Sequence, residues 1–166
     1  MSENVQRESL WRRWVVNPVI TQLTQGTSPS KIAQAMAFGV TTGVFPLLGM
    51  TTIVSLAVGI PLKLNQPVLQ VFRELSYPVH LGTILLFMRA GEDLFGAEHV
   101  TLSIPMLTER FFADPGRFMQ DFGMIGLYAV VVWLLIAPLL LGTVYFISRP
   151  LVEKLANRLN LIPHDA

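Results

Sequence analysis

Apolar residues fall into three long regions along the chain. No charged residue occurs between Lys31 and Lys63, and none occurs between Asp121 and Arg149. Both stretches exceed the roughly 20 apolar residues that a helix needs to cross the hydrocarbon layer of a membrane. A further apolar region, residues 64–90, lies between them. The pattern therefore predicts an all-α integral membrane protein, a small bundle with three membrane regions.

The first region is too long to be one upright helix. A continuous helix over 32–62 would measure about 46 Å, whereas the hydrocarbon layer is about 30 Å thick. The excess coincides with Pro46, which removes a backbone hydrogen bond, and with Gly49, which adds conformational freedom. We therefore expect two half-helices, near 30–44 and 51–62. They form either a re-entrant hairpin or a kinked, tilted span, and the break must face protein or a water-filled cavity.

Polar residues follow one face of the second region. The polar positions are Gln66, Gln70, Arg73, Tyr77 and His80. Their spacings of four and three residues place them along one side of a helix, and Glu74 stands beside that face. Pro78 would disturb the hydrogen bonds near Glu74, which gives this region a second irregularity that contains proline.

The N-terminal segment carries basic residues between indoles. Within residues 9–16, Trp11 and Trp14 flank two arginines, a pattern typical of a helix on the membrane surface, and a frayed cytosolic terminus is the alternative. Asn17-Pro18 is expected to interrupt this helix. Ser28-Pro29 then begins the first membrane helix, because serine can cap free amide groups and proline fits the first helical turn.

The charges of the connecting segments predict the orientation. The segment 91–121 is acidic, and within it Ser103 to Phe112 has the pattern of a short amphipathic helix that Ser103 caps and Asp114-Pro115-Gly116 ends. Basic residues concentrate in the N-terminal segment and after Ser148, so the positive-inside rule places both termini in the cytoplasm. The simplest arrangement has a re-entrant first region, an outward second region and an inward third region. The predicted units are an N-terminal segment 1–27, a membrane domain 28–148 (broken helices 30–62, polar-faced helix 64–90, external loop 91–121, last span 122–148) and an amphipathic tail 149–166.

Composition excludes several classes of protein. Charged residues make up 14% of the chain, well below the roughly 25% of a soluble domain. The net charge is only +1, which argues against a nucleic-acid-binding protein, because such a protein needs a cluster of basic residues on one face. There is no cysteine, and the histidines are too scattered for a metal site. The HExxH, Gly-x-Ser-x-Gly, Walker and Rossmann patterns are also absent. We therefore expect no enzyme, no cofactor and no metal, with the lipid bilayer as a partner.

Arg73 and Glu74 are the most informative residues, because an ionisable group in the membrane costs several kcal/mol unless it is paired, hydrated or neutralised. One interpretation is a helix end at which the two pair or reach water. The sharper hypothesis is a polar cavity against the break, in which arginine binds a phosphate or carboxylate. Its substrate-binding residues would be Gln70, Arg73, Glu74, Tyr77 and His80. The helix-break side would be Pro46, Gly49, Thr51 and Thr52.

Three segments resemble a known family. They are residues 28–33 (SPSKIA), 37–51 (AFGVTTGVFPLLGMT) and 64–67 (LNQP). They are similar to the DUF2062 family of bacterial membrane proteins, and the resemblance covers roughly residues 10–148. It implies a small protein of the bacterial inner membrane with no established biochemical activity. Members of the family have an Asn-Pro pair where Tyr77-Pro78 stands here.

Two functions fit this pattern. Two successive membrane segments that are interrupted by proline are the best indication in a sequence of a substrate-binding site near the middle of the bilayer. This pattern favours transport or translocation of a small anionic or lipid-headgroup substrate. The alternative is a non-catalytic membrane scaffold or assembly partner. Ala35, Gly39 and Gly43 recur every four residues, so neighbouring helices can approach closely. A bundle of so few helices covers the broken backbone poorly, which favours a homo-oligomer or another membrane protein as partner.

Overall fold

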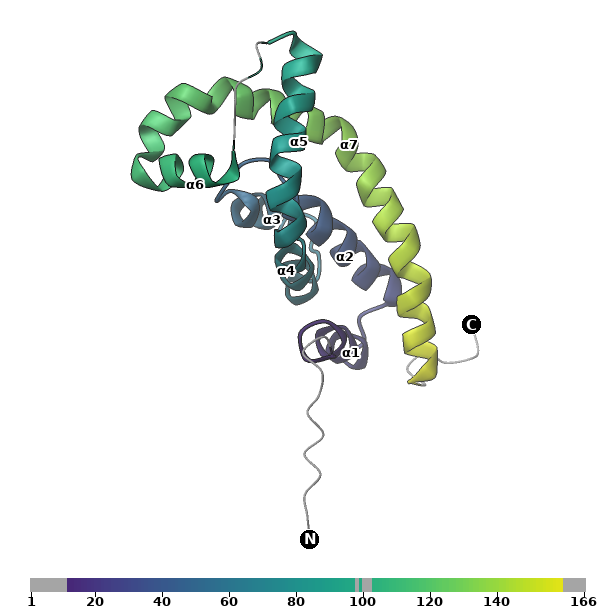
Figure 1. Ribbon diagram of the computed structural model, residues 1–166. Helices are drawn as coiled ribbons and strands as arrows, with labels where there is room; N and C mark the ends of the chain where they lie inside the picture. Colours follow the sequence, from purple (N-terminus) through teal and green to yellow (C-terminus); the bar gives the residue numbers. More distant parts are fainter. Residues whose placement is uncertain (1–11, 98, 100–102, 160–166) are drawn as a thin grey trace.

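The computed structural model describes residues 12–97, 99 and 103–159, which form helices and turns without a strand (Figure 1). The prediction of an all-helical fold is confirmed. Residues 9–11 of the predicted surface helix and residues 160–166 of the tail lie outside the described residues. The elements in chain order are η1 (Arg12–Val16), α1 (Asn17–Thr24), α2 (Pro29–Gly43), α3 (Thr51–Gly59), α4 (Gln66–Leu75), α5 (Tyr77–Phe95), α6 (Ile104–Ala113) and α7 (Pro115–Arg158).

The first apolar region is broken as predicted. α2 ends at Gly43 and α3 begins at Thr51, close to the expected half-helices. The Oγ of Ser28 caps α2 by accepting a hydrogen bond from the backbone N–H of Lys31 at 3.4 Å. Between the two helices the chain turns through Gly49, whose φ of 76° lies in the left-handed region that glycine adopts without a steric penalty.

Both ends of this α2–α3 hairpin lie at the same end of the molecule. Lys31, near the start of α2, lines the same pocket as Lys63 and Asn65, which follow α3. The side chain of Asn65 also donates a hydrogen bond to Gln22 of α1. The chain therefore reverses direction at the break, whereas the two ends of a kinked span would lie far apart.

The second apolar region forms two helices, and the expectation of one polar-faced helix over 64–90 is wrong in this respect. α4 ends at Leu75 and α5 begins at Tyr77, with a bend at Ser76 (Figure 1). Pro78 has no N–H to donate to the preceding turn, so it lies in the first turn of α5, where none is needed. The Ser76 hydroxyl satisfies the end of α4 by donating to the carbonyl oxygen of Phe72 at 2.8 Å.

The third apolar region belongs to α7, a helix of 44 residues that extends beyond the predicted span 122–148. Asp114 caps its start, where Oδ1 accepts a hydrogen bond from the N–H of Arg117 at 3.0 Å. The same residue follows the end of α6, so the Asp-Pro-Gly sequence both ends one helix and begins the next. At its other end α7 includes 149–158, which the sequence analysis assigned to a separate tail.

One membrane-spanning candidate emerges from the described part of the chain. Within Phe122–Arg158 of α7, an 18-residue window has a mean hydropathy of 2.5, and this helix is long and apolar enough to cross a membrane. α5, with 19 residues, is slightly longer than this window, but it carries the charged residues Arg89, Glu92 and Asp93. α7 also curves over the other helices (Figure 1) and contains Pro138, a common cause of bending.

The N-terminal prediction needs a correction, because α1 begins at Asn17 where an interruption was expected. Pro18 occupies the first turn of α1, where a proline costs no hydrogen bond. Val19 and Leu23 of α1 are buried and pack into an apolar cluster at the base of the molecule. This packing holds α1 against the other helices.

Two apolar clusters hold the helices together. The base cluster comprises Val19, Leu23, Ile32, Ala35, Val68, Leu69, Val152 and Ala156. The upper cluster comprises Val44, Phe45, Ile84, Phe87, Met88, Leu107, Phe122, Ala129, Val132 and Trp133. Because α1 and the end of α7 share the base cluster, they lie at the same end of the molecule, and α5 runs away from that end (Figure 1).

Candidate functional site

Small residues on α2 bring α4 into close contact, as their spacing predicts. A Cβ atom on Gly39 would lie 2.5 Å from the carbonyl oxygen of Leu69. A Cβ atom on Gly43 would lie 2.9 Å from the carbonyl oxygen of Arg73. These backbones approach too closely to admit a larger residue, so α2 positions the part of α4 that carries the predicted site.

The polar residues of α4 face α3 and form a polar seam between the two helices. Gln70 Nε2 donates to Ser55 Oγ at 3.3 Å, and Ser55 Oγ donates to the carbonyl oxygen of Thr52 at 2.8 Å. Farther along, the Gln66 side chain lies 2.7 Å from the Cβ position of Gly59. The two helices therefore run in opposite directions along the seam. The members of the polar seam are Thr51, Thr52, Ser55, Gln66, Gln70, Arg73 and Glu74.

Arg73 lies where the seam meets the start of α3. Its Nε donates to Gln70 Oε1 at 2.8 Å, and its Nη1 donates to the hydroxyls of Thr52 at 2.9 Å and Thr51 at 3.4 Å. Its Nη2 pairs with the carboxylate of Glu74. The Arg73 side chain is only 12% exposed, whereas that of Glu74 is 63% exposed. The guanidinium is thus held within the seam and its counter-ion is accessible.

The first turn of α3 adds to the positive potential beside Arg73. Met50, at the N-cap, provides no side-chain hydrogen bond to the amide groups of this turn. Uncapped amides and the helix dipole attract anions. Together with the hydroxyls of Thr51 and Thr52, the guanidinium makes a set of donors that suits a small anion. The same donors also tie α4 to α3, so the arrangement stabilises the packing of the hairpin.

Tyr77 and His80, the remaining predicted site residues, lie on α5. Tyr77 is exposed, His80 is buried, and their rings are 6.0 Å apart. None of the hydrogen bonds between described residues links either side chain to Arg73. α4 ends at Leu75 and α5 begins at Tyr77, so a spacing counted along one helix does not carry over to these two residues. The structure therefore brings Gln70, Arg73 and Glu74 together with α3, but not the α5 residues.

Protein covers the first part of the break, Val44 to Pro46. Pro46 is fully buried, and the ring of Phe45 packs edge-on against Trp133 with centroids 5.1 Å apart. Trp133 Nε1 donates to the carbonyl oxygen of Thr41 at 3.1 Å, which ties α7 to the end of α2. Phe111 of α6 lies 3.5 Å from the Cβ position of Gly49. α6 and α7 therefore pack against one side of the turn between the two half-helices, while Gly49 and Met50 are exposed on the other.

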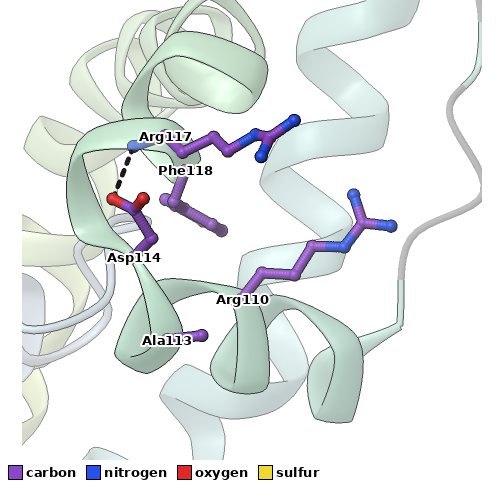
Figure 2. A pocket seen from close by; sticks show the side chains of 5 residues that line it. All are labelled: Arg110, Ala113, Asp114, Arg117 and Phe118. Atoms are coloured by element: carbon purple, nitrogen blue, oxygen red, sulfur yellow. Dashed lines mark hydrogen bonds between the residues drawn. The ribbon is translucent and has the colours of Figure 1, made fainter.

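Sequence reasoning did not identify two pockets that carry basic side chains. One, of about 340 Å³, lies at the base between Lys31 and Lys63, where Thr27, Gln34 and Asn65 supply polar groups. The other, of about 330 Å³, lies between α6 and α7 (Figure 2). The only signal at the base was the pair of lysines that bounds the first apolar region. Across the described residues, no group of three acidic or histidine side chains is arranged to hold a metal ion.

Comparison with known proteins connects the chain to one described family. No curated protein and no solved structure matches it. Residues 12–159 match the family described as an uncharacterized protein conserved in bacteria, DUF2062. The match covers every described helix, including all of α7. It confirms the resemblance drawn from the segments around the break. The chain belongs to the DUF2062 family.

Proposed function

We propose that the protein is integral to the bacterial inner membrane, with both termini in the cytoplasm. α7 supplies a helix that is apolar enough to span the bilayer. The α2–α3 hairpin starts and ends beside α1, which supports a re-entrant segment. α4 and α5 then lead away from that end and α7 returns to it. This path agrees with an outward second region and an inward third region, and the basic base of the molecule fits the positive-inside rule.

We further propose that the protein transports or translocates a small anionic or lipid-headgroup substrate. The observation that carries this proposal is the contact between Arg73 and the first turn of α3, where Nη1 donates to Thr51 and Thr52. In transporters with discontinuous helices, helix ends at the break bind the charged group of the substrate. A substrate anion would compete with the exposed carboxylate of Glu74 for Arg73 and would also accept hydrogen bonds from the threonine hydroxyls.

The base pocket supports an anionic substrate. Lys31 and Lys63 contribute two ammonium groups to it, and neither forms an ion pair with another described residue. Lys63 also has a φ of 51°, a left-handed conformation that disfavours side chains other than glycine and asparagine. Strain of this kind clusters at functional sites. The pocket would attract anions to the cytoplasmic opening of the hairpin.

A non-catalytic scaffold is the second candidate, and one observation favours it. Each nitrogen of the Arg73 guanidinium already has a partner within the chain. A side chain bonded in this way can serve helix packing alone. Ile53 and Leu56 of α3, with Ile60 directly after it, also form an exposed apolar face, which suits a second copy of the chain or another membrane protein. Neither candidate function is enzymatic.

Flux across proteoliposomes tests the proposal. Purified wild-type protein is reconstituted, and the movement of radiolabelled small anions and of fluorescent headgroup-labelled lipids is followed. The variants are Arg73→Ala, Arg73→Lys and, as a control at the other end of α7, Arg149→Gln. We expect flux by the wild type and the control, a strong reduction in Arg73→Ala, and a smaller one in Arg73→Lys, which keeps the charge but loses the planar fork.

Two results would contradict transport through the seam. Unchanged flux in both folded Arg73 variants would remove Arg73 from the site. Absence of flux by the wild type for every substrate class, together with copurification of a fixed protein partner, would favour the scaffold. Circular dichroism and gel filtration of each variant separate loss of function from loss of fold.

A further inference from the structure

The pocket between α6 and α7 has the charge of a phosphate-binding site. Its lining residues are Arg110, Ala113, Asp114, Arg117 and Phe118, and its volume is about 330 Å³. Figure 2 shows both arginine side chains extending to the same side of the pocket, one from α6 and one from the first turn of α7. Two elements that are separate in the chain thus present two guanidinium groups to one space.

Both guanidinium groups are available to a ligand. Neither Arg110 nor Arg117 forms an ion pair or a side-chain hydrogen bond within the described ranges 12–97, 99 and 103–159. Arg110 instead lies over the ring of Phe122, 5.7 Å from its centroid, and this cation–π contact orients the side chain without neutralising it. A bound phosphate would find two planar donors already near each other, which suits bidentate contacts.

The one acidic side chain of the pocket is already engaged. Asp114 caps α7 by accepting the backbone N–H of Arg117, and Figure 2 shows its carboxylate turned toward that N–H and away from the guanidinium groups. The formal charge of the lining side chains is +1, two arginines against one aspartate. A singly charged phosphate diester would balance it.

The surroundings favour the phosphate of a lipid over a soluble one. Phe112 on α6 is 77% exposed, and Met119 on α7 is 52% exposed, so each of the two helices exposes a large apolar side chain next in sequence to a residue that lines the pocket. An amphipathic surface of this kind binds at the boundary between headgroups and acyl chains. α6 also lies beside the break, because Phe111 contacts the Gly49 turn. An anionic lipid at this position would touch the same helix that packs against the turn of the hairpin.

We propose that Arg110 and Arg117 bind the phosphate of an anionic phospholipid headgroup at the α6–α7 corner. The two guanidinium groups hold the phosphate oxygens, and the exposed apolar residues beside them contact the acyl chains. The site shares no residue with the polar seam or with the base pocket. It does not depend on transport, so Arg73 variants are expected to keep it.

Titration of the full-length protein in a non-ionic detergent tests this proposal. The probe is a short-chain phosphatidylglycerol, compared with phosphatidylcholine, glycerol 3-phosphate and inorganic phosphate, and binding is measured by native mass spectrometry and calorimetry. The variants are Arg110→Gln/Arg117→Gln and, to keep the charge, Arg110→Lys/Arg117→Lys. Arg149→Gln/Arg158→Gln is the control that also removes two charges, since both residues are exposed at the opposite end of α7.

We expect phosphatidylglycerol to bind the wild type and the control equally, and to bind the double glutamine variant about tenfold or more weakly, as loss of charge-assisted hydrogen bonds implies. The lysine variant should retain part of the affinity. Equal affinity for glycerol 3-phosphate and for the lipid would support the phosphate site but assign it to a soluble ester. Equal binding of phosphatidylglycerol to the wild type and to a folded double glutamine variant would overturn the proposal.

Discussion

Replacing Gly39 with alanine tests the close contact that positions Arg73. The added Cβ atom would lie 2.5 Å from the carbonyl oxygen of Leu69 and 2.9 Å from the Cβ atom of Phe72. Ordinary van der Waals contact needs at least about 3.4 Å, so α4 must move away from α2 by about 1 Å. Overpacking of this kind costs about 1–3 kcal/mol. The shift would also lengthen the hydrogen bonds of the polar seam.

A matched control separates this cost from helix propensity. Alanine is favoured over glycine in a helix interior by about 1 kcal/mol. Gly82 in α5 has open space at its Cβ position, so Gly82→Ala should raise the free energy of unfolding by this amount without a clash. The two variants should therefore differ by about 1–3 kcal/mol, or about 3–9 °C in Tm for a chain of this size. The measurement is thermal unfolding in detergent, followed by far-UV circular dichroism. Equal shifts in both variants would refute the close packing of α2 on α4.

Two further predictions concern single side chains. Lys63→Gly should raise the free energy of unfolding by about 1 kcal/mol, because glycine adopts the left-handed φ without strain, whereas Lys63→Ala should bring no comparable gain; equal stability of the two variants would contradict this. Trp133→Phe removes the buried hydrogen bond to the carbonyl oxygen of Thr41 and should lower Tm by an amount equivalent to about 1–3 kcal/mol. A Tm unchanged from the wild type would show that this bond does not tie α7 to α2.

Local signals in the sequence predicted the helix boundaries that depend on one or two residues. The length of the first apolar region, with Pro46 and Gly49 near its middle, predicted the break. Ser28 and Ser103 were identified as caps, and both accept the expected backbone hydrogen bonds. Each cap acts within one helical turn, so no knowledge of the rest of the fold was needed to identify it.

Proline was the least reliable signal, because its meaning depends on its position in a helix. Pro18 was expected to interrupt a helix and instead lies in the first turn of one, and α7 continues past Pro150. Pro78 was recognised as an irregularity, but the helix pair that it divides was treated as one face. This is why Tyr77 and His80 were grouped with Arg73, although no hydrogen bond between described residues joins either side chain to it.

The polar seam was partly predictable, whereas the pockets were not. The spacing of Gln66, Gln70 and Arg73 showed that α4 has a polar face, and the break was the natural partner for it. The pairing of Ser55 with Gln70 depends on the hairpin reversing direction, which the sequence left open. The basic pockets bring together residues from distant elements, and only the fold determines such proximity.

Site-directed labelling tests the central claim, that α2 and α3 enter and leave the membrane from the side of the termini. The chain has no cysteine, so each introduced thiol reports on one position. The variants are Gln25→Cys before α2, Leu62→Cys after α3 and Asp93→Cys near the end of α5, all at exposed positions. A membrane-impermeant maleimide is applied to spheroplasts and to inverted vesicles. The account predicts that positions 25 and 62 react from the cytoplasmic side and position 93 from the other. Reaction of positions 25 and 62 from opposite sides would contradict it.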